Sequence, residues 1–206
     1  MRASRWRSRR AFWPRCWPMQ GLAERLAVIV LAAGASRRFG AADKLLEPLG
    51  GRPLAAHAFA LAGACGAGAA IAVTARDGVA DLARAAGLVS VSVPPGGDQS
   101  ASVRAGLAAL PAQVDAVLFM LADMPWLRAE DLAALLDLGA PACARDGAVR
   151  MPPALLPRAW CEAAPLSGDS GLRPLLARIA PDRCLDRPSG RLRDVDRPSD
   201  LFPAQG

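Results

Sequence analysis

Four short strand patterns, three of them apolar runs and one with alternating serines, alternate with helical patterns, and this alternation constrains the fold more than any other feature of the sequence. The strand patterns are LAVIVLAAG (26–34), AAIAVTA (69–75), LVSVSV (88–93) and DAVLFMLAD (115–123). Helical patterns separate and follow them, at 53–65, 78–87, 100–110 and 128–139. Short apolar strands that alternate with helices are typical of a parallel sheet with both faces covered. We therefore expect a doubly wound α/β fold up to about residue 140.

The pattern is looser in the last third of the chain. Segment 147–160 is rich in proline, 167–180 is typical of a loop that leads into a helix, and 192–202 of a short strand or turn before a helix start. No part of it indicates a second hydrophobic core. We expect residues 25–206 to form a single domain.

The basic charge of the chain belongs to its N-terminal end. The formal net charge is +6, and residues 1–20 hold six arginines and no acid, so the remainder is neutral. We expect residues 1–24 to be a disordered tail or a wrongly assigned start, with Met19 as the true first residue. A targeting segment and a nucleic-acid-binding arm are the alternatives. The apolar stretch of a secretory or twin-arginine signal is missing.

The composition indicates a cytoplasmic protein. No apolar run approaches the roughly 20 residues that span a bilayer. The five cysteines are scattered and none forms a C-x-x-C pair, so neither a zinc site nor a disulfide framework is expected. We predict a soluble protein that acts on small molecules, with no membrane or nucleic-acid partner.

A glycine-rich stretch, LAAGASRRFGAADK, directly follows the first predicted strand. Ligands bind at the carboxyl ends of strands in open α/β sheets, and free backbone N–H groups in such a loop suit phosphate oxygens. The stretch ends at Lys44, the one lysine among 25 basic residues. A lysine is a compact point charge, whereas arginine is a broad planar fork. Lys44, with Arg37 and Arg38, therefore indicates a crowded phosphate site.

Two further polar clusters follow strands of the same predicted sheet. Ser100 and Ser102 stand at the start of a predicted helix, where they either cap the helix or contact a nucleotide. Asp123 ends the fourth strand, where its carboxylate is suited to hold Mg²⁺ beside phosphates; a turn cap is the alternative.

Several familiar motifs are excluded. The glycine spacing fits neither a Walker P-loop nor a dinucleotide-binding G-x-G-x-x-G. GDSG (168–171) also surrounds the nucleophile of trypsin-like proteases, which are β-barrels. The single histidine, His57, lies in an alanine-rich helical pattern and is interpreted as structural.

The motifs LAAGASRRFG…K, QSASVRAGL, LADMPWL, SGDSG and DVDRPSDL occur in this order between residues 26 and 202. In that order they resemble the molybdenum cofactor cytidylyltransferases, the MocA-type branch of the MobA-like NTP transferase family. The resemblance implies a Rossmann-like, mostly parallel sheet of the nucleotide-diphospho-sugar transferase type. It also implies an enzyme that transfers CMP from CTP to molybdopterin, uses Mg²⁺, and makes transient contact with a molybdenum enzyme or its chaperone.

The resemblance assigns roles by position. Nucleotide contacts fall on Leu31, Ala32, Ala33, Gly34, Ser36, Arg38, Gly40, Lys44, Ser102 and Arg104. Arg38, Lys44 and Asp123 are the expected catalytic residues. Gly168 and Asp169 match a loop near the acceptor, and Asp196 completes the metal site with Asp123. Ala33, where the guanylyl branch has a second glycine, favours a pyrimidine and hence CTP.

Two other functions stay open. One is a related nucleotidyltransferase that takes GTP, or a sugar or alcohol phosphate as acceptor. The other is a non-catalytic carrier or chaperone of the molybdenum cofactor, which would bind the pterin without forming pyrophosphate.

Overall fold

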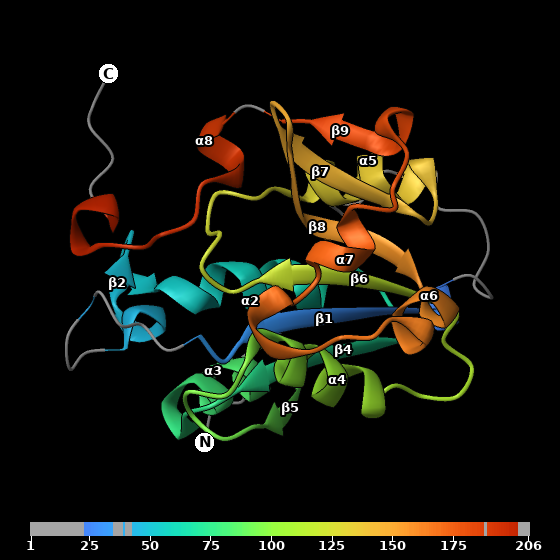
Figure 1. Cartoon of the computed structure of the whole chain (residues 1–206). Coiled ribbons are helices and arrows are strands. Elements are labelled where there is room, and N and C mark those ends of the chain that lie inside the picture. The colour runs from blue at the N-terminus through green and yellow to red at the C-terminus, as the bar shows by residue number, and fades with distance from the viewer. Residues whose placement is uncertain (1–22, 35–38, 40–42, 188, 202–206) are drawn as a thin grey trace.

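The first predicted strand lies in the interior of the sheet. The computed structural model describes residues 23–34, 39, 43–187 and 189–201. Within these ranges seven strands form one sheet in the order β5-β4-β1-β6-β8-β7-β9 (Figure 1). The strands are β1 (Leu26–Ala32), β4 (Ala69–Thr74), β5 (Val89–Ser92), β6 (Ala116–Leu121), β7 (Ala142–Asp146), β8 (Val149–Pro157) and β9 (Cys184–Asp186).

The four predicted strands are neighbours, and all run parallel. β1 pairs with β4 on one side and with β6 on the other, and β4 pairs with β5. β8 is antiparallel to both β6 and β7, whereas β9 is parallel to β7. The prediction of a doubly wound, mostly parallel α/β domain is confirmed.

Helices cover both faces of the sheet, and the period-two alternation of β1 assigns its residues to them. Val28 and Val30 face one core, and Ala27 and Ile29 face the other. The first core is closed by α2 (Leu54–Ala64), α3 (Asp77–Ala85), α5 (Ala129–Leu138) and α8 (Ser189–Leu192). The second is closed by α4 (Gln99–Ala108), α6 (Arg158–Ala163) and α7 (Arg173–Leu176). Burial on both faces explains why β1, β4 and β6 are continuously apolar, whereas the edge strand β5 is only partly buried.

The proline-rich segment 147–160 forms β8, an interior strand, although its sequence does not predict one. Proline cannot donate to a sheet ladder. The β7–β8 register shifts between Cys143 and Ala144, whose partners are Ala154 and Met151, so Pro152 and Pro153 fall opposite the irregularity. The two prolines are accommodated at a β-bulge, where the ladder is interrupted.

Two short elements connect the core to the glycine-rich stretch. The 3-10 helix η2 (Lys44–Leu46) is followed by a small hairpin of β2 (Pro48–Leu49) and β3 (Arg52–Pro53). His57 in α2 braces this hairpin: its Nε2 donates to the Leu49 carbonyl at 3.0 Å, and its Nδ1 accepts from Arg52 at 2.9 Å. The histidine thus has a structural role at the base of the hairpin.

Two predictions concern the N-terminal tail and the absence of a membrane span. Residues 1–22, which make up most of the predicted tail, lie outside the described residues. Over the part of the chain that the structure describes, no helix is both long and apolar enough to cross a bilayer.

Gly106→Ala should destabilise the fold, because α4 packs closely on the sheet at this position. An added Cβ would lie 2.9 Å from Ile29 Cγ2 and 3.1 Å from Val73 Cγ2. We expect a loss of about 1–3 kcal/mol in the free energy of unfolding, as for other overpacked cores. Urea denaturation measures it. Gly190→Ala in α8 meets no atom within 4 Å and should be neutral or slightly stabilising; equal effects of the two changes would contradict the packing.

Protonation of His57 should weaken the fold. Burial of the ring and the charge of Arg52 lower the pKa of His57, although the bond to Leu49 opposes them. A histidine whose pKa is lower when folded stabilises the protein fully above its unfolded pKa of about 6.5, and that contribution is lost as the pH falls. Urea denaturation at pH 7.5 and 5.5 should show a smaller pH dependence for His57→Asn than for wild type. An unchanged dependence would refute the assignment.

Candidate active site

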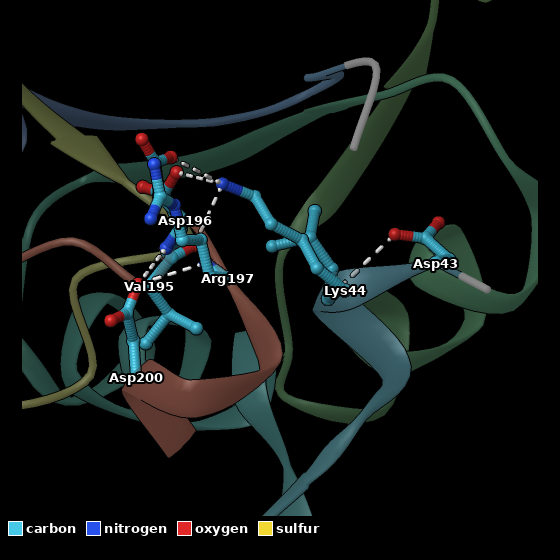
Figure 2. A network of polar contacts seen from close by, with 8 residues as sticks. Asp43, Lys44, Val195, Asp196, Arg197 and Asp200 are labelled. Carbon is cyan, nitrogen blue, oxygen red and sulfur yellow. Dashed lines mark hydrogen bonds and ion pairs between the residues drawn. The ribbon is translucent and has the colours of Figure 1, made fainter. Parts of the chain in front are cut away.

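Lys44 interacts with both of the predicted metal ligands. Its Nζ donates to Asp123 Oδ2 at 2.7 Å and to the Val195 carbonyl at 3.0 Å, and lies 3.6 Å from Asp196 Oδ1. The Lys44 side chain is 10% exposed, that of Asp123 21% and that of Asp196 43%. Figure 2 shows the Lys44 side chain extended from η2 toward the segment that carries Val195 and Asp196. One ammonium therefore joins the glycine-rich stretch, the end of β6 and the C-terminal segment.

Asp43 fixes the backbone from which Lys44 extends. Its Oδ1 accepts from Leu45 N at 3.1 Å and so caps η2, and its Oδ2 is 3.3 Å from Arg76 NH1. In Figure 2 a dashed line joins the Asp43 carboxylate to the start of η2, and the Lys44 ammonium lies at the other end of the Lys44 side chain. Because Arg76 follows β4, this ion pair anchors the end of the glycine-rich stretch to the carboxyl edge of the sheet.

The end of β6 and the C-terminal segment are joined through their backbones as well. Ala122 N donates to the Leu31 carbonyl at 3.1 Å, and Val195 N donates to the Asp123 carbonyl at 2.9 Å. Asp200 Oδ2 accepts from Asp196 N and Arg197 N at 3.0 and 2.8 Å, which closes the turn after Val195. These bonds hold Asp123 and Asp196 together at the Lys44 ammonium.

In the described part of the chain, the region around Lys44 holds more negative than positive charges. Asp194, which sequence analysis did not single out, is exposed as a residue, but partial burial of its carboxyl group and the charges of Asp123 and Asp196 raise its pKa. Lys44 acts in the opposite direction and lowers it. A position with an excess of carboxylates is suited to attract a cation. The sequence could have indicated Asp194 through the segment RDVD, in which it lies two residues before the predicted metal ligand Asp196.

The carboxylates can hold a metal ion only together with other ligands. In residues 23–34, 39, 43–187 and 189–201, no group of three or more His, Cys, Asp and Glu side chains is arranged as a metal site. Asp123 and Asp196 offer hard oxygen donors, and they already share one cation. Mg²⁺ is commonly held by one or two carboxylates, with the remaining positions taken by water and substrate phosphates. The donor set fits such an ion.

A second polar group lies at the start of α4 and is built on different interactions. The N-cap is Asp98, whose carboxylate accepts from Ala101 N at 2.5 Å. The alternative that Ser100 or Ser102 caps this helix is therefore wrong. Ser100 is fully buried, and its hydroxyl accepts from Gly171 N and contacts Ser170 Oγ, both at 3.2 Å. Ser100 docks the predicted acceptor loop onto the predicted nucleotide-binding helix.

The loop that carries GDSG depends on two glycines. Gly168 and Gly171 have φ values of +57° and +53°, which L side chains rarely adopt. A Cβ at Gly171 would also lie 2.7 Å from Gln99 Oε1. Gly168 and Asp169 are exposed, as expected for residues that a substrate must reach.

Arg104 also belongs to this second group, but its guanidinium has protein partners. It donates to the Leu166 carbonyl at 2.5 Å and lies 3.9 Å from Asp98. Its side chain is half exposed. Arg104 thus supports the loop in this conformation, and its predicted contact with a nucleotide stays a prediction.

The remaining predicted residues follow β1. Leu31 and Ala32 end the strand, Ala33 is half-buried, and Gly34 is exposed with no atom within 4 Å of an added Cβ. Ser36, Arg38 and Gly40 lie outside the described residues. Figure 1 places the end of β1, the loop after β6 and the GDSG segment at the same end of the sheet. The structure thus gathers most predicted site residues at the carboxyl edge, in two groups.

The fold is shared with several solved structures, one of which is described as a nucleotidyl transferase. A homologue of Mycobacterium tuberculosis Rv0371c from Mycobacterium sp. strain JC1 is 27% identical, with a TM-score of 0.69, and the match covers 87% of this chain and 93% of that one. A nucleotidyl transferase from Methanothermobacter, Mth528, is 21% identical, with a TM-score of 0.72 and coverage of 86% and 94%. Rv0371c in complex with manganese is 24% identical, with a TM-score of 0.63 and coverage of 80% and 90%.

Sequence comparison identifies the family. No curated protein matches the chain. The family model of the MobA-like NTP transferase domain matches residues 28–184, which hold the glycine-rich stretch, Asp123, α4 and the GDSG loop. Because this match spans well over half of the chain, the protein belongs to the MobA-like NTP transferase family and is a nucleotidyltransferase.

Proposed function

We propose that the protein transfers CMP from CTP to molybdopterin and releases pyrophosphate, with Mg²⁺ as the metal. The observation that supports this best is the position of Lys44, whose ammonium is within 3.6 Å of both Asp123 and Asp196 at the carboxyl edge of the sheet. A cation and two carboxylates at one point can bind a triphosphate and its metal together. The motif order that resembles the cytidylyltransferase branch supplies the choice of substrates.

Asp123 and Asp196 are the proposed metal ligands. Both offer carboxylate oxygens, and both face a cation already. The manganese bound by Rv0371c, a structural neighbour, supports the use of a divalent ion by this fold. When bound, the ion would neutralise charge on the triphosphate and on the departing pyrophosphate.

The nucleotide is proposed to lie along the glycine-rich stretch. Leu31, Ala32, Ala33, Gly34 and Ser36 would cradle the base and triphosphate with backbone N–H groups. Lys44 and Arg38 would add positive charge. Ser102 and Arg104 on α4 would contact the nucleotide from the other side, and Gly168 and Asp169 would face the acceptor.

The proposed reaction is an in-line displacement. The terminal phosphate of molybdopterin attacks the α-phosphorus of CTP; the new P–O bond forms as the bond to the pyrophosphate oxygen breaks. A phosphate nucleophile is already ionised, so the site needs no general base. The protein contributes position and charge neutralisation, which are the main terms in such transfers.

A non-catalytic carrier explains the site less well. Burying the Lys44 ammonium costs free energy that its two carboxylates must offset, and a protein that only holds a pterin has no use for this arrangement. A GTP-dependent transferase would use the same groups. Ala33 is the residue that favours CTP over GTP.

Pyrophosphate release tests the proposal directly. The protein is incubated with Mg²⁺ and molybdenum-loaded molybdopterin, with either CTP or GTP. Release with CTP alone supports the proposal. Release with GTP alone moves the protein to the guanylyl branch, and no release with either refutes molybdopterin as the acceptor.

Lys44→Ala should lower turnover by about 10²–10³, the usual cost of losing one strong electrostatic stabiliser. Asp123→Asn should abolish metal-dependent turnover, because it removes the charge that holds the ion. Arg145→Met is the matched control, because it also removes one positive charge from an ion pair, the one that Arg145 on β7 forms with Asp186 on β9. Steady-state kinetics with thermal unfolding of each variant measure these effects. A decrease under threefold for Lys44→Ala would refute its role.

Gly34→Ala should impair nucleotide binding without affecting the fold. Its φ is outside the left-handed region and an added Cβ meets no described atom, so the unfolding temperature should not change. If the triphosphate approaches this backbone, the KM for CTP should rise by about tenfold, which corresponds to about 1.4 kcal/mol. An unchanged KM would place the nucleotide elsewhere.

A further inference from the structure

The Lys44 ammonium occupies the position from which a cation neutralises both proposed metal ligands. It lies 2.7 Å from Asp123 Oδ2 and 3.6 Å from Asp196 Oδ1, and it takes the Val195 carbonyl as a third oxygen at 3.0 Å. Three oxygens around one buried cation are the kind of ligands that a hard metal ion also prefers. Lys44 and a divalent ion therefore draw on the same oxygens.

Two cations cannot both interact at full strength with these carboxylates. Like charges at a few ångströms repel each other strongly when the site is partly shielded from water, and the Lys44 side chain is only 10% exposed. A divalent ion that binds Asp123 must therefore weaken the ion pair with Lys44 or displace it. Lysine can yield, because its charge is carried at the end of a flexible four-carbon chain.

A triphosphate removes this conflict. Its oxygens give the ammonium a new set of acceptors, and its negative charges offset both cations. The free energy needed to displace Lys44 from the carboxylates is then recovered in the contact between Lys44 and phosphate. Metal and nucleotide should each bind more tightly when the other is present, because coupling between two ligands is reciprocal.

We propose that Lys44 is an internal counter-ion that couples divalent metal binding to nucleotide binding. Without nucleotide it neutralises Asp123 and Asp196 and lowers their affinity for metal; with nucleotide it turns to the triphosphate and leaves the carboxylates to the metal. The inference rests on the proposed function in assigning the metal to these two residues. It goes beyond that function because it gives Lys44 a second role, in the order of binding.

The C-terminal segment makes this arrangement possible. Val195 is fully buried, and its backbone binds both halves of the ion pair: its carbonyl accepts from Lys44, and its N–H donates to the Asp123 carbonyl. Val195 and Asp196 lie beyond residues 28–184, which match the family model. Two of the oxygens that contact the ammonium thus come from the segment that follows the residues matched by the family model.

Binding of Mn²⁺ in the absence of nucleotide tests the proposal. Free Mn²⁺ is measured by electron paramagnetic resonance with wild type, Lys44→Met and the control Arg145→Met. Arg145 also pairs with a carboxylate, Asp186, at 2.8 Å, so both variants lose one paired positive charge. We expect Lys44→Met to bind Mn²⁺ about tenfold tighter than wild type, within the usual range of coupling between sites, and Arg145→Met to match wild type. Equal or weaker binding by Lys44→Met would overturn the proposal.

The wild-type protein offers an independent measurement if Lys44→Met does not fold. Lys44 is the one lysine in the chain, so ¹⁵N-lysine labelling gives a single side-chain ammonium signal in NMR spectra. Saturation with Mg²⁺ and CTP, or with Mg²⁺ and GTP if that is the nucleotide bound, should shift this signal. An ammonium signal that does not change when calorimetry shows the nucleotide bound would overturn the proposal.

The two proposals fail in different ways. Tighter Mn²⁺ binding by Lys44→Met together with no pyrophosphate release from CTP and molybdopterin supports the counter-ion role and rejects the substrates. Pyrophosphate release together with unchanged Mn²⁺ binding by Lys44→Met supports the substrates and rejects the counter-ion role.

Discussion

The ion pair between Lys44 and Asp123 is the interaction on which the arrangement of the site depends. It joins residues 79 positions apart, and the bond from Lys44 to the Val195 carbonyl spans 151 positions. A buried ammonium without partners would be strongly destabilising, so the glycine-rich stretch, the end of β6 and the C-terminal segment are stable only when they meet. The charge that the chemistry requires thus also determines where three distant segments of the chain lie.

The two halves of the site are built on different physical interactions. The half around Lys44 relies on charge, with Asp123, Asp196 and Asp194 around one cation. The half at α4 relies on backbone geometry, with Ser100 bonded to Gly171 and positive φ values at the glycines of the GDSG loop. Charge suits a triphosphate and its metal, whereas a loop held by backbone bonds suits the recognition of shape.

Most of the fold was predictable from the sequence because it depends on local patterns. The four runs are parallel strands, and β1, β4 and β6 are continuously apolar because both of their faces are covered, whereas the edge strand β5 is partly exposed and alternates with serine. β8 was missed because Pro152 and Pro153 argue against a strand, and only pairing with β6 and β7 around a bulge accommodates them. Cys143 and Cys184, which are far apart in the sequence, are paired in register on β7 and β9 with their sulfurs 3.6 Å apart. No local pattern could indicate this contact.

The sequence by itself determined the doubly wound α/β architecture and which side chains follow strands at the edge where ligands bind. It also singled out Lys44, Asp123 and Asp196, through residue type and motif order. Only the tertiary structure decided that these three meet, that Val195 supplies a backbone oxygen, and that Asp98 rather than a serine caps α4. The reason is physical: burial and periodicity are encoded residue by residue, whereas the partner of a buried charge is determined by how the whole chain packs.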